Sequence, residues 1–197
     1  MNTKQMRNLL GASVIMATAG FSAAADQFVL KLQGSMGAIS PGLQDTLKVQ
    51  EVERFEADGA SFVILDAQNE AYLETFLNVT SLSPLAVMKV DFVNSPVVGG
   101  GVAAAEIAQD GLQTFVIERP IPGVGSFPLA RKEGISRASN AAIAQMEGKV
   151  EWVHSYLTEV GTVCIYRATD EGQIADHAQL AGAPLGPITA VDRVLPD

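Results

Sequence analysis

The sequence is poor in side chains that bind transition metals or transfer protons near neutral pH. Its 197 residues include two histidines, one cysteine and one tryptophan. All four lie between positions 151 and 181, and residues 1–153 contain no histidine. Any chemistry that needs an imidazole or a thiol is therefore confined to this one segment.

A cysteine pair is also missing. The lone Cys164 cannot form an internal disulfide, so the core must hold the fold without one. Cys164 lies in an apolar, strand-like run, where a buried and unreactive thiol is the usual case.

Beyond the first residues the chain has no apolar run long enough to span a bilayer. Residues 1–25 contain two basic residues, a short apolar run and, at the end, three consecutive alanines. This pattern is typical of a secretory signal peptide with cleavage between Ala25 and Asp26; an uncleaved anchor is the alternative. We therefore expect a periplasmic or secreted protein with no membrane association after cleavage.

Basic residues are few. The signal segment carries two of the 13 basic residues and none of the 22 acidic ones, so 11 basic and 22 acidic side chains remain. The resulting net charge of −11 repels phosphate backbones, which argues against a nucleic-acid partner. It gives mild support to binding of a metal cation.

The hydrophobic pattern repeats one order of elements, β-α-β-β-α-β, twice. The expected strands cover 27–32, 52–56, 60–65, 85–93, 113–118, 152–157, 162–166 and 188–195, and the expected helices cover 43–50, 68–77, 129–146 and 170–181. Such a repeat predicts an α+β protein made of tandem ferredoxin-like (βαββαβ) units. Each unit would be an antiparallel four-stranded sheet with both helices on one face.

A glycine- and alanine-rich segment separates the two expected units. It covers residues 95–110 and includes three consecutive glycines, but it lacks the lysine and hydroxyl residue of a P-loop. We interpret it as a linker between a degenerate unit at 26–94 and a second unit at 111–197. The two units would form an intramolecular pseudo-dimer, and a homodimer is an alternative.

Four sequence blocks in the second unit carry a family resemblance. They are Ile117-Glu118-Arg119-Pro120-Ile121-Pro122-Gly123, Trp152-Val153-His154-Ser155-Tyr156, Cys164-Ile165-Tyr166 and Asp176-His177-Ala178. In order and spacing they resemble the nickel-binding, nickel-responsive ferredoxin-like domains of bacteria. The resemblance spans about residues 114–195 and implies the same fold, dimers of such units and a bound Ni²⁺ ion.

Strand alternation predicts which side chains share a face of the second sheet. We expect Val153, Leu157, Val163, Ile165, Phe115 and Ile117 on the helix side, and Trp152, His154, Tyr156, Cys164, Tyr166, Val116 and Glu118 on the open side. An imidazole and a carboxylate on one face suit Ni²⁺, Zn²⁺ or Cu²⁺. The main hypothesis is therefore a non-catalytic metal-binding protein with His154 and Glu118 as leading ligands.

Three further side chains belong to that hypothesis in lesser roles. Tyr156 and Cys164 are nearby candidate ligands. His177 follows the helical spacing of Ile174 and Ala178, which places it on the helix face turned towards the sheet. We expect it at a second or supporting position. The first unit contains no histidine and is expected to be a structural partner.

Two other classes of function stay open. Ferredoxin-like dimers include small monooxygenases and isomerases that enclose a cavity between sheet and helices, where His154, Tyr156 or His177 could act as acid or base. The other class is an inert periplasmic interaction module. Hydrolase motifs such as G-x-S-x-G and H-E-x-x-H are not found.

Overall fold

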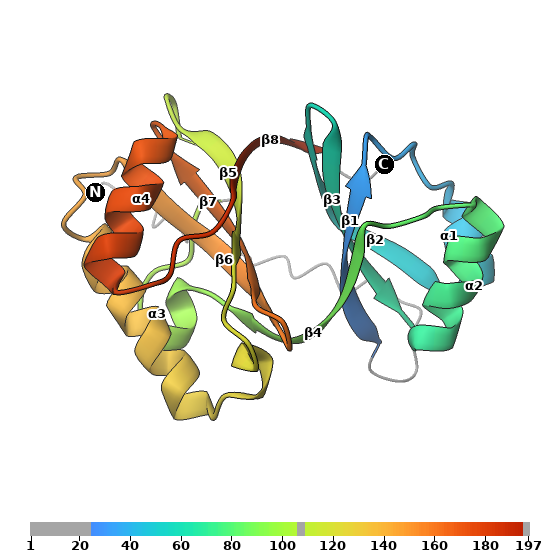
Figure 1. The fold of residues 1–197 in the computed structure, drawn as a ribbon, viewed down its shortest axis with the longest axis horizontal. Helices are drawn as coiled ribbons and strands as arrows, with labels where there is room; N and C mark the ends of the chain where they lie inside the picture. The colour runs from blue at the N-terminus through green and yellow to red at the C-terminus, as the bar shows by residue number, and fades with distance from the viewer. Residues whose placement is uncertain (1–24, 106–108, 195–197) are drawn as a thin grey trace, which may run out of the picture.

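The structure, a computed structural model, describes residues 25–105 and 109–194 (Figure 1). The expected signal peptide lies outside the described residues, apart from Ala25. No helix in these ranges is long and apolar enough to cross a bilayer.

All the strands and helices expected from the sequence are present, which confirms the mixed α+β class. The strands are β1 (Asp26–Gln33), β2 (Val49–Ala57), β3 (Ala60–Ala67), β4 (Ala86–Asn94), β5 (Gln113–Arg119), β6 (Val150–Thr158), β7 (Thr162–Ala168) and β8 (Ile188–Val194). The helices are α1 (Pro41–Leu47), α2 (Glu70–Thr80), α3 (Leu129–Ile143) and α4 (Glu171–Ala181), with short 3₁₀ helices η1 (Pro96–Gly99) and η2 (Val124–Ser126) that the sequence did not predict.

The second helix of each half begins with the same kind of cap. Asn69 accepts a hydrogen bond from the Tyr72 N–H at 3.3 Å, and Asp170 accepts one from the Gln173 N–H at 3.1 Å. These bonds satisfy backbone donors that the first helical turn leaves free. Helix α4 ends at Gly182, whose φ of 65° is easily adopted only by glycine.

The eight strands form one closed antiparallel barrel in the order β1-β3-β2-β8-β5-β7-β6-β4. The prediction of a separate four-stranded sheet in each unit is therefore not confirmed, because the two sheets are joined at both edges. The first half (β1–β4) contributes the order β4-β1-β3-β2, and the second half (β5–β8) contributes β8-β5-β7-β6. Both follow the same internal order, as the repeated element pattern implies.

Two long strands close the barrel by leaving their own half. In β4, residues 86–89 pair with β1 and residues 90–94 pair with β6. In β8, residues 188–191 pair with β5 and residues 192–194 pair with β2. Each half would otherwise present two unpaired edge strands, and closure gives those edges backbone partners.

The first residues of the segment that we expected to be a linker pack on α3. The Ser136 hydroxyl donates to the Ser95 carbonyl at 2.7 Å, and the Asn140 amide donates to the Pro96 carbonyl at 2.9 Å. A side chain at Gly99 would come within 2.6 Å of the α3 backbone, so this close approach requires glycine. Residues 106–108 of the segment lie outside the described residues.

The side chains form three apolar cores in three layers. Helices α1 and α2 cover the outer face of the first half, and α3 and α4 cover that of the second (Figure 1). The barrel interior lies between them and is filled by Val29, Phe55, Phe62, Ile64, Val116, Tyr156, Val163, Ile165 and Val191. The inner face of the second-half sheet is thus covered by the first half of the same chain.

A bulge in β6 reverses part of the predicted face assignment. Trp152 pairs with Tyr166 but His154 pairs with Ile165, so Val153 is an extra residue in the strand. Trp152 therefore faces the helices while His154 and Tyr156 face the barrel interior. Strand β7 has the opposite orientation to the one predicted, because Tyr166 lies opposite Trp152 on the helix side and Val163 lies opposite Tyr156 on the interior side.

The face predictions for the other positions have mixed outcomes. Phe115 and Ile117 face the helices, as predicted, and Val116 faces the interior. Cys164 and Tyr166 were expected on the open side and instead pack in the core under α3 and α4. Leu157 lies on this helix side, as predicted. Val163 and Ile165 were expected under the helices and instead fill the barrel interior.

A buried carboxylate joins the two halves inside the barrel. Glu53 of β2 is 3% exposed, and its Oε1 atom lies 2.6 Å from His154 Nε2 and accepts the Tyr156 hydroxyl. Arg193 lies 3.4 Å from the other oxygen. Burial raises the pKa of the Glu53 carboxyl, but the hydrogen bond and charge of His154, with Tyr156 and Arg193, outweigh burial and lower this pKa below its ordinary value.

Glu53→Gln should lower the free energy of unfolding by about 2–4 kcal/mol, because it removes a buried charge from its hydrogen-bond partners. Because of the lowered pKa, the contribution of Glu53 to the free energy of unfolding also depends on pH. The carboxylate stabilises the fold above the unfolded pKa of Glu, and this contribution is lost as pH falls through the folded pKa. Urea unfolding at pH 7 and at pH 3.5 should show a smaller difference between wild type and variant at the lower pH. Exposed Glu74→Gln is the matched control, and equal effects of both changes would contradict the interpretation.

Candidate functional site

The predicted metal ligands lie on two sides of one sheet. Inside the barrel, Glu118 forms an ion pair with Lys31 at 2.6 Å, and His154 pairs with Glu53. Cys164 and His177 lie on the helix side. Within residues 25–105 and 109–194 no three His, Cys, Asp or Glu side chains gather as a metal would require. The structure does not bring the predicted ligands together around one ion.

A cavity occupies the space between the second-half sheet and its helices, where the enzyme alternative places one. Its volume is about 460 Å³. The sheet contributes Arg119, Trp152, Ser155, Leu157, Thr162, Cys164 and Tyr166; α3 contributes Arg131, Gly134, Ile135, Ala138 and Ser139; α4 and the segment after it contribute His177 and residues 181–184; Asn94, Ile121, Val124 and Phe127 complete the wall.

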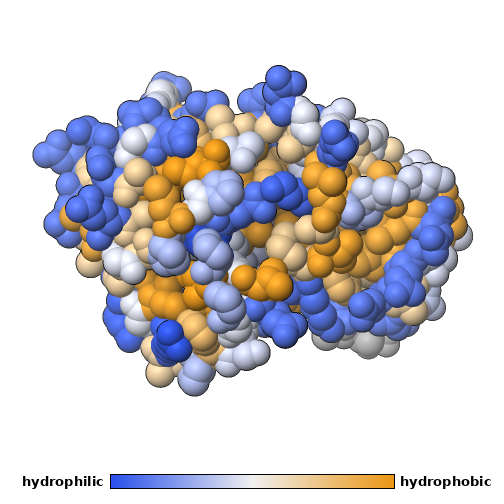
Figure 2. Space-filling view, in the orientation of Figure 1, coloured by the Kyte–Doolittle hydropathy of each residue, from blue (hydrophilic) through white to orange (hydrophobic). Residues whose placement is uncertain are grey.

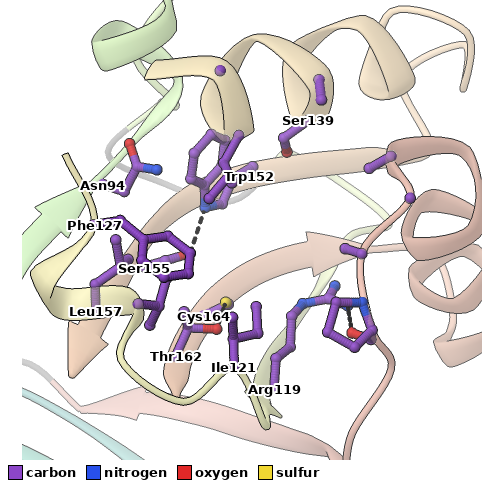
Figure 3. Close-up of a pocket in the computed structure, with 18 of the residues that line it drawn as sticks. Asn94, Arg119, Ile121, Phe127, Ser139, Trp152, Ser155, Leu157, Thr162 and Cys164 are labelled. Atoms are coloured by element: carbon purple, nitrogen blue, oxygen red, sulfur yellow. Dashed lines mark hydrogen bonds between the residues drawn. The ribbon is translucent and has the colours of Figure 1, made fainter. Parts of the chain in front are cut away.

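One part of the cavity is aromatic and apolar. The Trp152 ring stacks on Tyr166 with 6.2 Å between ring centroids and 15° between planes. The Trp152 indole N–H donates to the Ser155 hydroxyl at 2.9 Å, which satisfies its only donor (Figure 3). Phe127 and Leu157 add apolar surface. This part of the wall therefore suits an apolar group.

A second part of the wall carries buried polar side chains in a chain of contacts. His177 is 1% exposed, and its Nε2 atom lies 3.1 Å from the Ser139 hydroxyl, which lies 3.3 Å from the Tyr166 hydroxyl. The other ring nitrogen of His177, Nδ1, has no hydrogen-bond partner among the described residues. Buried polar atoms without a partner are rare in folded proteins and call for an explanation.

Arg119 is the buried cation of the cavity. It is 5% exposed, and its Nη1 atom donates to the Pro184 carbonyl at 2.5 Å (Figure 3). Its Nη2 atom has no partner within the part of the chain that the structure describes. The cavity thus combines an apolar wall with an unsatisfied guanidinium nitrogen.

The surroundings keep the two titratable rings of this site uncharged near pH 7. Burial and the positive charge of Arg119 lower the pKa of His177 to about 4. Burial raises the pKa of the Tyr166 hydroxyl above its ordinary value. A neutral imidazole can accept a proton, and a protonated phenol can donate a hydrogen bond.

The mouth of the cavity lies along α3. Arg131 is exposed there, with its guanidinium 3.5 Å from the centre of the Phe127 ring, and Ile135 is 38% exposed. On the face shown in Figure 2, hydrophobic residues reach the surface in patches separated by hydrophilic residues. An apolar ligand can therefore enter beside a surface cation.

The sequence indicated some of these residues but not their assembly. Cys164 and His177 were candidates, and both line the cavity. Arg119 was quoted only as part of the family resemblance, and Ser139 was not singled out. The available signal for Arg119 was its position one residue after Glu118 at the end of an apolar strand, which places it on the helix side of the sheet.

His177 should make the free energy of unfolding depend on pH between 4 and 6.5. Its folded pKa of about 4 lies below the unfolded value of 6.5, so the unfolded state binds more protons in this window and stability falls as pH falls. Between pH 7 and pH 5 the loss due to this residue should be roughly 2 kcal/mol. Urea unfolding of wild type and His177→Gln at both pH values measures it. The contribution of His177 is the loss of unfolding free energy in the wild type minus the loss in the variant. Equal losses in the two proteins would show that His177 is not held neutral by the fold.

Comparison with known proteins first defines the class of fold. A chlorite dismutase from Candidatus Nitrospira defluvii in complex with imidazole matches with a TM-score of 0.50 at 9% identity, over 89% of this chain and 93% of that chain. A double mutant of the same enzyme gives a TM-score of 0.50 at 9% identity, over 86% and 91%. A protein provisionally described as a monooxygenase, from Lactobacillus acidophilus NCFM, gives 0.39 at 9% identity, over 86% and 94%. The architecture is thus of the ferredoxin-like, chlorite dismutase type.

The family comparison is narrower. Residues 115–191 match the family described as "Nickel responsive protein SCO4226-like". This confirms the resemblance seen in the second half of the chain. The match covers less than half of the chain, and its description refers to a nickel response. Among curated protein sequences none matches this chain.

These findings contradict the main functional prediction of a non-catalytic metal-binding protein. The fold matches an enzyme, chlorite dismutase, along most of both chains, whereas the nickel-responsive match is confined to the second half. The expected ligands are also separated by the sheet. The cavity between the second-half sheet and its helices is the feature that the alternative, a small ferredoxin-like enzyme, expects.

Proposed function

We propose that the cavity under α3 and α4 is the active site of a small enzyme of the isomerase type. Its reaction would move a proton on a small organic substrate at a carbon beside a carbonyl group. The observation that carries the proposal is the pairing of a buried, neutral His177 with a buried Arg119 in one cavity, each with a nitrogen that lacks a partner. A base beside a fixed positive charge is the arrangement that such a proton transfer requires.

His177 would act as the general base and acid. Its lowered pKa keeps the ring uncharged, so it is ready to take a proton at neutral pH. The contact of Nε2 with Ser139 fixes the ring orientation, and Nδ1 is the ring nitrogen that has no partner among the described residues. Ser139 in turn contacts Tyr166, which extends the hydrogen-bonded chain to a second proton carrier.

Arg119 would favour, through its positive charge, the negative charge that develops on the substrate when the proton leaves. The guanidinium is fixed by its bond to the Pro184 carbonyl and lies in a largely apolar cavity. A charge held in place away from water stabilises a developing anion more strongly than a solvated one does.

Nickel has no role in the proposed reaction, and its binding can be tested separately. The family description refers to a nickel response. The imidazole and thiol of the cavity, His177 and Cys164, have no Asp or Glu beside them in its wall, and no group of three such donors forms among the described residues. The residues present do not fit a complete protein-built site for this ion.

Export to the periplasm or outside the cell belongs to the same proposal. The basis is the signal-like sequence of residues 1–25. Pairing of two chains also stays a prediction, and sedimentation of the mature protein measures it.

The proton transfer should be visible as deuterium incorporation in D₂O. 4-Phenyl-2-butanone and 4-oxo-4-phenylbutanoate both carry C–H groups beside a ketone, and NMR follows their exchange. We expect exchange above the buffer rate for at least one of them, and a loss of 100-fold or more in His177→Gln because the base is removed. Asp176→Asn, on the exposed side of α4, should keep the wild-type rate.

The exchange rate should stay nearly constant from pH 8 to pH 5, because His177 is neutral throughout this range. Exchange no faster than in buffer, or equal rates in wild type and His177→Gln, would overturn the proposed function.

A further inference from the structure

We infer that the cavity selects a compact organic acid: an apolar body with one carboxylate that pairs with Arg119. This inference rests on the proposed function, because it names the substrate class of the same cavity. It is carried by the charges of the wall, by the unpaired state of Arg119 and by the apolar character of the remaining surface.

The ionisable wall of the cavity is basic, although the chain as a whole is acidic. Arg119 and Arg131 line it, and no Asp or Glu does so among the described residues. The whole chain has a formal net charge of −9. His177 and Tyr166 are uncharged near pH 7 for the reasons given above. The cavity is therefore a local positive region, which attracts an anion and repels a cation.

The state of Arg119 calls for an anionic partner. Its hydrogen bond to the Pro184 carbonyl joins it to a neutral group, and within residues 25–105 and 109–194 its Nη2 atom has no hydrogen-bond partner. A buried charge without a counter-ion is costly, because it has lost its hydration. A carboxylate compensates that cost through charge-assisted hydrogen bonds to the guanidinium.

The rest of the ligand must be apolar. Side chains of Ile121, Val124, Phe127, Trp152 and Leu157 line the cavity, and the Trp152 indole N–H is already bonded to Ser155. A polar body would lose hydrogen bonds to water without replacement there. The volume of about 460 Å³ is within the range of small-molecule sites and limits the body to a compact ring system or short chain.

Arg131 gives the anion a path to the buried cation. It lies exposed on the first turn of α3, and its guanidinium stacks on Phe127, which itself lines the cavity. A cation at the mouth raises the local concentration of anions. Arg119 then holds the carboxylate inside, so the two arginines have different roles along one path.

The test uses a matched pair of ligands that differ in charge. 4-Oxo-4-phenylbutanoate carries a carboxylate, and 4-oxo-4-phenylbutanamide replaces it with a neutral group of similar shape. Trp152 is the only tryptophan of the chain and lines the cavity, so its fluorescence reports occupancy directly. We expect the acid to bind at least 10-fold more tightly than the amide in the wild-type protein.

Three variants test whether Arg119 causes the preference for the acid over the amide. Arg119→Gln should bind acid and amide equally, while Arg119→Lys should keep part of the preference because it keeps the charge but loses the planar fork. Arg137→Gln, an exposed position on the same helix as Arg131, should leave both affinities unchanged. Binding of the amide to Arg119→Gln shows that its cavity is intact; if this variant does not fold, the wild-type ratio and Arg119→Lys decide.

The outcomes separate this inference from the proposed function. Equal binding of acid and amide by the wild-type protein overturns the acid preference and leaves the cavity as a binding site. Acid preference that persists in Arg119→Gln overturns the role of Arg119. Preference for the acid without deuterium exchange retains the ligand class and rejects the isomerase-type reaction. No change in Trp152 fluorescence with either ligand overturns both the acid preference and the proposed active site.

Discussion

The structure depends on the pairing of strand edges between the two halves of the chain. Each half has two edge strands, and β2–β8 and β4–β6 pairing removes all four as free edges. Closure creates the interior core and brings together two polar contacts between the halves, Glu53 with His154 and the partly exposed pair Lys31 with Glu118. The cavity lies outside this barrel, against a sheet whose other face is fixed by the first half. Rigidity of the site therefore comes from residues that do not touch it.

One extra residue decides which side chains can act together. The bulge at Val153 turns Trp152 towards the helices and His154 towards the interior. The two histidines consequently have separate surroundings: His154 contacts a carboxylate of the first half, and His177 lies near Arg119 with no acidic neighbour in the cavity wall. The predicted metal site at His154 and Glu118 therefore gives way to internal contacts of these two residues, and His177 belongs to the proposed acid–base site.

Element order was predictable from the sequence because turn residues and hydrophobic spacing are local signals. Closure was not, since the residues of β4 and β8 that cross to the other half look like ordinary strand residues. His177 could be placed on the buried face of α4 from its spacing with Ile174 and Ala178. The faces of β6 and β7 could not be assigned, because a bulge leaves no mark in the hydrophobic pattern. Arg119 could be identified as a cavity residue only from the structure, because α4 and the segment after it form the opposite part of the wall.

The covalent connection between the halves has a consequence for dilution. A barrel assembled from two separate chains falls apart below its dissociation constant, because association depends on concentration. Here both partners of each closing strand pair belong to one chain, so their effective concentration is fixed by the connection between them. A site supported by such a barrel keeps its form at any protein concentration.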